Sequence, residues 1–467
     1  MCSSPFQAQI SVTLEHETLS LYKQSRLCPR RSVNADNPYN LTEPNRFGKE
    51  VPMALKIVYK ICCGIDVHKT FVVACIATTN SQGVTIYKRK RFSTFTRGLK
   101  ELMHWLLDNN CEDVCMESSG KYWIPVYNIL EKNCKIVLAH PKYVKAIRGK
   151  KTDKKDAKWI ADLFKHDLVA GSFMPPADIR QLRDLMRYRY KLTCFMSSEK
   201  NRLQNSLTVS NIQLASVVSD TFGKSSLRIL DKLLEDTSNT TFDVEPLIHG
   251  SMKGKIPELE LAIDGFITPE QAGKIKVIKK HFEDLEARKA ELEELILALA
   301  SPYQQELDLI LTTPSLKSIF TAIGIISEIG VNMESFPSAK HLCSWAGLTP
   351  TNNESAGKKK SVRVSKAGCY IKPLLVQCAN SVVKSEKHPE IRNRYLRLKR
   401  RRGHKKAIIA IARMLLTALY NMLKNKEPYN AELYRKSDVL PVDREITVEQ
   451  AVLMAQFQGY KIKSATG

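Results

Sequence analysis

Residues 56–92, KIVYKICCGIDVHKTFVVACIATTNSQGVTIYKRKRF, decide the fold class of this chain. Runs rich in valine, isoleucine and cysteine at Lys56–Asp66, Phe71–Thr78 and Val84–Phe92 are separated by short polar turns. Runs of this length and composition predict three consecutive antiparallel strands. The first folded domain is therefore expected to open with a β-meander.

After the meander the pattern changes to strands that alternate with helices. The expected elements are a helix at about Arg97–Asn109, a strand ending at Glu117, a helix after Trp123, a strand at Cys134–His140 and helical segments through Leu168. A meander followed by such alternation fits a mixed sheet flanked by helices, the ribonuclease H-like arrangement. Other α/β folds share the pattern.

The remainder of the chain divides where the composition changes. Pro175-Pro176 closes the α/β region, and Ile179–Leu207 and Pro269–Leu299 read as long charged helices. Near-heptad apolar spacing in the second predicts a helical hairpin or coiled coil, although an ordinary bundle helix also fits. The fold class expected is α/β plus α. The expected domains are a disordered leader at 1–54, a ribonuclease H-like α/β domain at 55–175, a helical or coiled-coil linker at 176–302, a mostly helical domain at 303–430 and a tail at 431–467.

The leader has mixed polarity and no sustained period, as in disordered segments. Met53 stands directly before the first strand, so it is a candidate for the true start of translation.

The composition indicates a soluble globular protein with a polyanionic partner. With 72 lysines and arginines against 48 aspartates and glutamates, the net charge of +24 favours nucleic acid over an anionic membrane. No stretch approaches the ~20 apolar residues of a membrane span, and no signal peptide is recognised, so we expect a cytoplasmic protein. The 12 cysteines show no recurring CxxC pair, so we expect reduced, buried thiols.

Four acidic residues form the first candidate site. Asp66 ends the first strand, Glu117 ends a later strand, and Asp153 and Asp156 are spaced to project from one helix face. Four converging carboxylates cannot all stay ionised without a counter-charge, and their hard oxygens select Mg²⁺ or Mn²⁺. The set predicts a metal-dependent phosphoryl-transfer site. Any one of these acids alone fits an ordinary surface role better.

The second candidate site lies in residues 347–368, GLTPTNNESAGKKKSVRVSKAG. A serine in a glycine-containing loop among cations could attack a phosphodiester, because the positive field stabilises its alkoxide and holds the phosphate. A helix cap or a turn is the commoner role of such a serine. The surrounding cations that we expect to bind nucleic acid are Lys358, Lys359, Lys360, Arg363 and Lys366.

A third feature is the basic run of residues 392–406, RNRYLRLKRRRGHKK. Such a run repels itself unless it is solvated or neutralised, and phosphate neutralisation predicts nucleic-acid binding. A solvated helix face is the alternative. Tyr395 is a weak candidate for base stacking, and the cations singled out for nucleic-acid binding are Arg400, Arg401, Arg402, Lys405 and Lys406.

Taken in order, these motifs resemble the insertion-sequence transposases related to the Piv invertases, which join an N-terminal RuvC-like DEDD domain to a C-terminal transposase domain. The resemblance rests on Gly-Ile-Asp66-Val-His-Lys, Glu117-Ser-Ser-Gly, Lys-Thr-Asp153-Lys-Lys-Asp156-Ala, and Gly-Leu-Thr-Pro350 running to Glu-Ser355-Ala-Gly and Ser365-Lys-Ala-Gly. It spans about Lys56 to Tyr429.

The resemblance implies more than the residues alone do. It implies that the four acids bind Mg²⁺ and that Ser355, ahead of Ser361 and Ser365, forms a covalent link to DNA. It further implies a homo-oligomer, a dimer assembling to a tetramer, with a composite site in which the acidic domain of one subunit faces the serine domain of another. A structured bridge RNA that pairs with donor and target DNA is implied as a partner.

One position departs from the family pattern. Members often carry Pro-Gly-Ile-Gly near the start of the serine domain, where this chain reads Thr313-Pro314-Ser315-Leu316-Lys317. Loss of both glycines removes an easy backbone approach to phosphate.

Two other functions remain as alternatives to a transposase. One is a junction-resolving nuclease that uses water instead of Ser355, and the other is a nonenzymatic nucleic-acid-binding protein.

Overall fold

The computed structural model describes residues 42–44, 50–52, 55–118, 120–140, 153–238, 240–350, 353–355, 358–361, 363–432, 452–453 and 456. The chain divides into two compact units, Met1–Ser172 and Phe173–Gly467. Of the expected leader, the structure describes two short paired strands, β1 (Thr42–Pro44) and β2 (Glu50–Pro52). The rest of the leader and nearly all of the tail at 431–467 lie outside the described residues.

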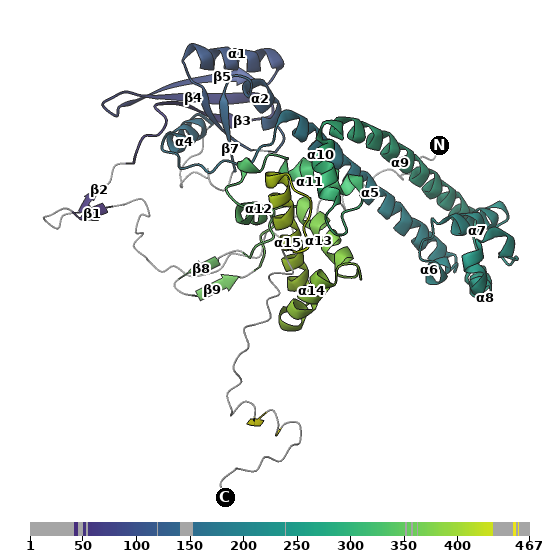
Figure 1. The fold of residues 1–467 in the computed structure, drawn as a ribbon. Helices are drawn as coiled ribbons and strands as arrows, with labels where there is room; N and C mark the ends of the chain where they lie inside the picture. Colours follow the sequence, from purple (N-terminus) through teal and green to yellow (C-terminus); the bar gives the residue numbers. More distant parts are fainter. Residues whose placement is uncertain are drawn as a thin grey trace, which may run out of the picture. The chain divides into compact units, whose positions relative to one another are not determined.

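The first unit is built on a mixed five-stranded sheet (Figure 1). Its strand order is β5-β4-β3-β6-β7, with β3, β4 and β5 antiparallel and β3, β6 and β7 parallel. The meander and the later alternation are therefore as expected. The elements are β3 (Ile61–Val67), β4 (Phe71–Thr79), β5 (Thr85–Ser93), α1 (Thr96–Asp108), β6 (Asp113–Glu117), α2 (Trp123–Leu130), β7 (Lys135–Ala139) and α4 (Asp153–Lys165).

Helices cover both faces of this sheet. Trp105 of α1 packs on Phe92 of β5 with ring centroids 5.4 Å apart, whereas Ala157 of α4 packs with Val73 and Cys75 of β4. Phe92 is one pleat out of phase with the β5 residues in register with Val73 and Cys75. Since successive side chains of a strand point to opposite faces, α1 and α4 lie on opposite sides of the sheet.

The first strand begins later than the sequence indicates. The amides of Val58 and Tyr59 donate to the Lys165 carbonyl at 2.9 and 3.2 Å, so this segment satisfies the end of α4 instead of extending β3. Helix C-termini leave carbonyls without intrahelical partners, which explains the pairing. The expected start at Lys56 was therefore wrong by five residues.

The second unit is mostly helical. Two long helices, α5 (Ala177–Val209) and α9 (Pro269–Ala300), pack along each other and match the two long helices expected there. The other elements are α6 (Leu214–Val217), α7 (Lys224–Glu235), η2 (Glu245–Leu247), η3 (Gly250–Lys255), α8 (Ile256–Ile263), η4 (Ser301–Tyr303), α10 (Gln304–Leu311), α11 (Ile319–Ile329), η5 (Met333–Ser335), α12 (Ala339–Trp345), β8 (Asn353–Ser355), β9 (Lys358–Ser361), α13 (Ile371–Val382), α14 (Pro389–Arg402) and α15 (His404–Asn425).

Two cores hold this unit together. One joins Leu182 and Leu192 of α5 and Ile296 of α9 to the helices around α15. The other packs the far parts of α5 and α9 against α7 and α8, with Leu203 and Ile275 fully buried. The first of these cores spans the expected linker and the C-terminal helices. The expected division of this unit into two domains stays a prediction.

One described helix, α15, is long and apolar enough to cross a membrane, contrary to the expectation that no stretch approaches this composition. Of its most apolar window, 67% is buried inside the protein. Leu415 and Leu419 are fully buried in the core of the second unit. A core helix of a soluble protein accounts for this apolar composition.

The cysteine expectation is largely met among the described residues. Ten cysteines of the described ranges are free, and eight of these are buried, the exceptions being Cys194 and Cys369. Burial raises the pKa of the Cys62 thiol to about 12, so this thiol stays protonated at neutral pH.

Candidate functional site

Asp66, the next-to-last residue of β3, and Glu117, the last residue of β6, lie at the same end of two neighbouring parallel strands. Ile65 of β3 is in register with Met116 of β6, so the next residues, Asp66 and Glu117, are opposite each other. Strands lie about 4.8 Å apart, and residues in register point to the same face. Both acids therefore share one face and one end of the sheet, with the Asp66 side chain 13% exposed.

Helix α4 crosses that face in close contact with β3. A Cβ atom at Gly64 would overlap the Ala157 carbonyl oxygen and the Ala161 amide nitrogen, so only glycine allows this approach. The Cys62 thiol donates to the Ala161 carbonyl at 3.7 Å, and the Tyr59 amide donates to the Lys165 carbonyl. The end of α4 thus lies over the start of the strand, and the two run antiparallel.

The spacing of these contacts locates the start of α4. Two strand residues advance about 6.6 Å, and four helix residues advance about 6 Å. Along the strand from Cys62 to Gly64, the contacting helix residue changes from Ala161 to Ala157. One further step along the strand reaches Asp66, and the matching step along the helix reaches Asp153. The backbone thereby brings the elements that carry all four acids to one end of one face.

The side chains are described only in part. Asp156 is partly buried, whereas the Asp153 side chain lies outside the described residues. Among the described side chains, no three histidines, cysteines or carboxylates converge closely enough to hold a metal ion. The backbone contacts bring helix α4 to the strands that carry Asp66 and Glu117, and the convergence of the four carboxylates stays a prediction.

One neighbour of the acids was quoted in the first motif but not singled out. His68 Nε2 lies 3.1 Å from Asp66 Oδ2, and its ring stacks on Phe71 with centroids 4.5 Å apart. The signal was available in the sequence, because residues i and i+2 of a strand share a face. His68 therefore orients the Asp66 carboxylate.

Ser355 lies in a two-stranded hairpin made by β8 and β9. Its backbone pairs with that of Lys358, and an isolated bridge between Pro350 and Val364 continues the ladder toward the base. The side chains of Ser355, Lys358, Lys359 and Lys360 lie outside the described residues. Arg363 and Lys366, which follow the hairpin, are exposed.

A pair of glycines closes the base of this loop. Gly347 and Gly368 have φ of +68° and +65°, in the left-handed region that favours glycine. A Cβ at Gly347 would lie 2.5 Å from the Ala367 carbonyl oxygen, and one at Gly368 would lie 2.7 Å from the Ala346 carbonyl carbon. The segments that enter and leave the loop are therefore in direct backbone contact. This contact fixes the base from which the hairpin extends.

The two alternative serines have local partners. The Ser361 hydroxyl accepts from the Arg363 amide, and the Ser365 hydroxyl accepts from the Ala367 amide, each at 3.3 Å. These are serine turns, the commoner role of a serine in such a loop.

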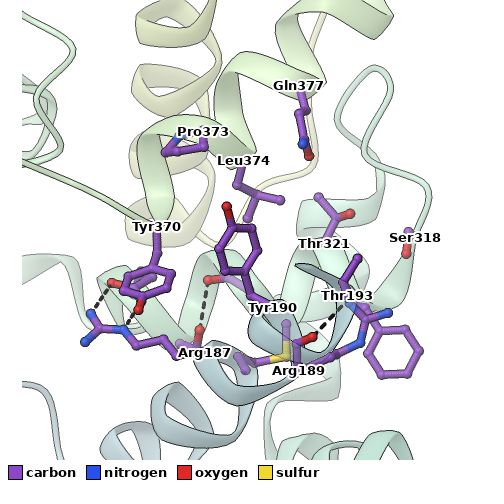
Figure 2. Close-up of a pocket in the computed structure, with 15 residues that line it drawn as sticks. Arg187, Arg189, Tyr190, Thr193, Ser318, Thr321, Tyr370, Pro373, Leu374 and Gln377 are labelled. Atoms are coloured by element: carbon purple, nitrogen blue, oxygen red, sulfur yellow. Dashed lines mark hydrogen bonds and ion pairs between the residues drawn. The ribbon is translucent and has the colours of Figure 1, made fainter. Parts of the chain in front are cut away.

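An ion pair braces the segment that leaves the loop. Arg187 of α5 donates to both carboxylate oxygens of Glu328 at 2.8 and 2.9 Å, and its guanidinium lies 4.5 Å from the Tyr370 ring centroid. Tyr370 follows Gly368 by two residues and directly precedes α13, without a side-chain capping hydrogen bond. Arg187 and Tyr370 line a pocket of about 260 Å³ together with Tyr190. Figure 2 shows these three residues around the pocket.

The late basic run lies on α14 and the start of α15. Arg400, Arg401, Arg402, Lys405 and Lys406 are all exposed. Tyr395, considered for base stacking, is instead 8% exposed, and its hydroxyl hydrogen-bonds His404 Nδ1 at 2.8 Å. The expectation for Tyr395 was therefore wrong, because its ring belongs to the core of the unit.

The turn that departs from the family pattern keeps a left-handed residue. Ser315 has φ of +65°, a conformation that costs a residue with a Cβ about 1–2 kcal/mol. The amide of Leu316 donates to the Thr313 carbonyl at 3.1 Å. The backbone thus keeps a glycine-like turn without the glycine.

Comparison with known proteins gives two family matches. A model of DEDD transposases of the IS110 type, described as a transposase, matches residues 63–212. A second, described as the transposase IS116/IS110/IS902 family, matches residues 308–396. The first match includes the four acids and the second includes Ser355, and together they cover half of the chain.

No curated protein matches the sequence at a significant level. Among solved structures, the chain is similar to a fowlpox virus resolvase solved in complex with Holliday junction DNA. The identity is 15%, over 22% of this chain and 72% of that chain, with a TM-score of 0.16. That score is too low to add to the sheet topology described above.

Proposed function

This chain belongs to the IS110 family of transposases and is a DNA recombinase, and from that premise we propose that it excises and inserts a mobile element through a serine nucleophile. The observation that carries the proposal is the antiparallel packing of α4 on β3. It directs the aspartate end of α4 to the strand ends that carry Asp66 and Glu117.

The acids fit a divalent metal ion. We propose that Asp66, Glu117, Asp153 and Asp156 together supply hard carboxylate oxygens, the donor set that Mg²⁺ or Mn²⁺ prefers. When bound, the ion would supply Lewis-acid stabilisation of charge on the phosphate. His68 positions the Asp66 carboxylate from the side of Phe71.

Ser355 supplies the nucleophile in this proposal. Its Oγ attacks phosphorus as its proton leaves, a serine–phosphate ester forms, and the phosphodiester bond to the departing strand breaks as the leaving oxygen takes up a proton. Lys358, opposite Ser355 in the hairpin ladder, contributes positive charge near this step. The ester keeps the bond energy, so a second hydroxyl can later reseal the strand.

The partners follow from charge and family. We propose that donor DNA, target DNA and a structured bridge RNA bind the basic surfaces, in the cytoplasm, and that a dimer assembling to a tetramer completes the site. The net charge of +24 and the exposed Arg400, Arg401 and Arg402 support this proposal.

Replacing these three arginines by glutamine should reduce the slope of log affinity against log salt, because each phosphate contact releases counterions. An unaltered slope would assign the run to a solvated face.

The acid site is tested by substitution with a matched control. Asp66→Asn, Glu117→Gln, Asp153→Asn and Asp156→Asn should each abolish strand cleavage in Mg²⁺ and weaken Mn²⁺ binding in calorimetry. Asp113→Asn, at the opposite end of β6 from Glu117, should do neither. Unchanged cleavage and metal binding in a folded variant would remove that residue from the site.

A further inference from the structure

The edge strand β5 carries cationic side chains on the same face of the sheet as Asp66 and Glu117. Asp66 of β3 is in register with Val73 of β4, and Val73 is in register with Arg91 of β5. Two strand spacings of about 4.8 Å separate the backbones of Asp66 and Arg91. One row across the sheet therefore runs from Glu117 through Asp66 to Arg91.

A chain of side-chain contacts beside this row also links Asp66 to Arg91. His68 bonds Asp66, the His68 ring stacks on Phe71, and the Arg91 guanidinium lies 3.6 Å from the Phe71 ring centroid. The stacking holds the guanidinium beside the acid end of the sheet, while Arg91 remains exposed. Arginine on an aromatic face keeps its donors available for a phosphate.

A second arginine extends this surface. Arg89 is in register with Cys75, so it shares the face of Arg91, and it is exposed. The two residues are about 7 Å apart along the strand, far enough to meet separate phosphates. Lys88 and Lys90 point to the opposite face, where Lys88 donates to Asn109 at 2.8 Å.

We propose that Arg89 and Arg91 bind the backbone of the DNA strand whose phosphate reaches the acids. The inference rests on the proposed function, because it takes the acids as the cleavage site. Clustered carboxylates repel a phosphate backbone, and cations on the flanking strand offset that repulsion where the strand enters. Stacked arginines are suited to the task, since their planar donors pair with phosphate oxygens.

Protection of the sheet edge is the competing explanation. Edge strands commonly carry lysine or arginine to prevent pairing with another chain. That role does not distinguish the two faces of β5, so Lys88 and Lys90 would share it equally. The alternation of the strand thus provides a matched control with the same charge change.

The test compares R89Q/R91Q with K88Q/K90Q in the full chain. Affinity for a mixed-sequence single-stranded oligonucleotide is measured without metal across a salt series, for DNA and for RNA of the same sequence. R89Q/R91Q should lower the DNA salt slope by about 1.4, from two phosphates at about 0.7 each, while K88Q/K90Q leaves it unchanged. R89K/R91K should restore most of the affinity, which excludes a folding defect.

A local readout separates this surface from the other cations of the chain. A benzophenone amino acid at Ser93, on the face of Arg91, should crosslink DNA, whereas one at Ile86, exposed on the other face, should not. The Ser93 crosslink should disappear in R89Q/R91Q and persist in K88Q/K90Q.

The outcomes distinguish this inference from the proposed function. Equal effects of the two double substitutions, equal crosslinks from both faces, or a loss confined to RNA would overturn the DNA assignment. Arginine-dependent DNA crosslinking in a wild-type protein that shows no metal-dependent cleavage would instead support the surface and refute the acid chemistry.

Discussion

Gly64→Ala tests the packing on which the acid site depends. The added methyl group would overlap the Ala157 carbonyl and the Ala161 amide, well inside the 3.4 Å at which ordinary contact begins. Both atoms are backbone, so no side chain can rotate away. Helix α4 must instead move off the strand by about 1 Å, since atoms repel steeply inside van der Waals contact.

The displacement has two measurable consequences. Overpacking of this kind costs about 1–3 kcal/mol of the free energy of unfolding. Because α4 carries Asp153 and Asp156, a shift of about 1 Å should lower the cleavage rate by about 10²-fold. Urea denaturation measures the first, and single-turnover cleavage of end-labelled DNA in Mg²⁺ measures the second.

Gly273→Ala is the matched control, because a Cβ at this position in α9 meets nothing within 4 Å. It should leave cleavage unchanged and stabilise the protein by about 0.5–1 kcal/mol, as alanine does in a helix interior. A Gly64→Ala protein with the stability and the cleavage rate of wild type would refute the close-packing argument.

Three further predictions concern the second unit. Gly368→Ala should lower the free energy of unfolding by about 2 kcal/mol or more in denaturation, since it places a Cβ against Ala346 at positive φ, and it should also reduce serine-dependent activity. Arg187→Met should destabilise the protein by about 3 kcal/mol, because it leaves the buried Glu328 carboxylate unpaired, and adding Glu328→Gln should recover part of the loss in a double-mutant cycle. Ser315→Gly should raise the melting temperature, as relief of its left-handed strain gains about 1 kcal/mol. A Gly368 variant of wild-type stability, additive effects in the cycle, or a lowered melting temperature for Ser315→Gly would each contradict the corresponding contact.

The sequence predicted the sheet well because its signals are local. Apolar runs and short turns located all four ends of β4 and β5 to within one residue, and the strand ending at Glu117 formed as expected. The start of β3 was predicted wrongly, because the amide of Tyr59 donates a hydrogen bond to the carbonyl of Lys165, at the end of a helix about a hundred residues away. A local pattern carries no information about such a partner.

The candidate site was predictable as a set of residues but not as an arrangement. The acids were chosen by type and spacing, yet the reason they can approach each other lies in Gly64, whose role depends on a helix that comes much later in the chain. The same holds for Gly347 and Gly368, which stand in recognisable motifs but act through backbone contact with each other's neighbours. Tyr395 failed in the opposite way, since an aromatic in a basic run gives no sign that it is buried.

The most direct test of the account is a search for DNA attached to Ser355. The purified protein is mixed with the proposed guide RNA, end-labelled donor and target DNA and Mg²⁺, then denatured, and protein that carries the DNA label is detected after electrophoresis. Wild type should give a covalent DNA–protein adduct, and Ser355→Ala should give none while still binding both nucleic acids. Free cleaved ends without an adduct would contradict transesterification and indicate a hydrolytic, junction-resolving nuclease, and an adduct that survives Ser355→Ala would move the nucleophile to Ser361 or Ser365.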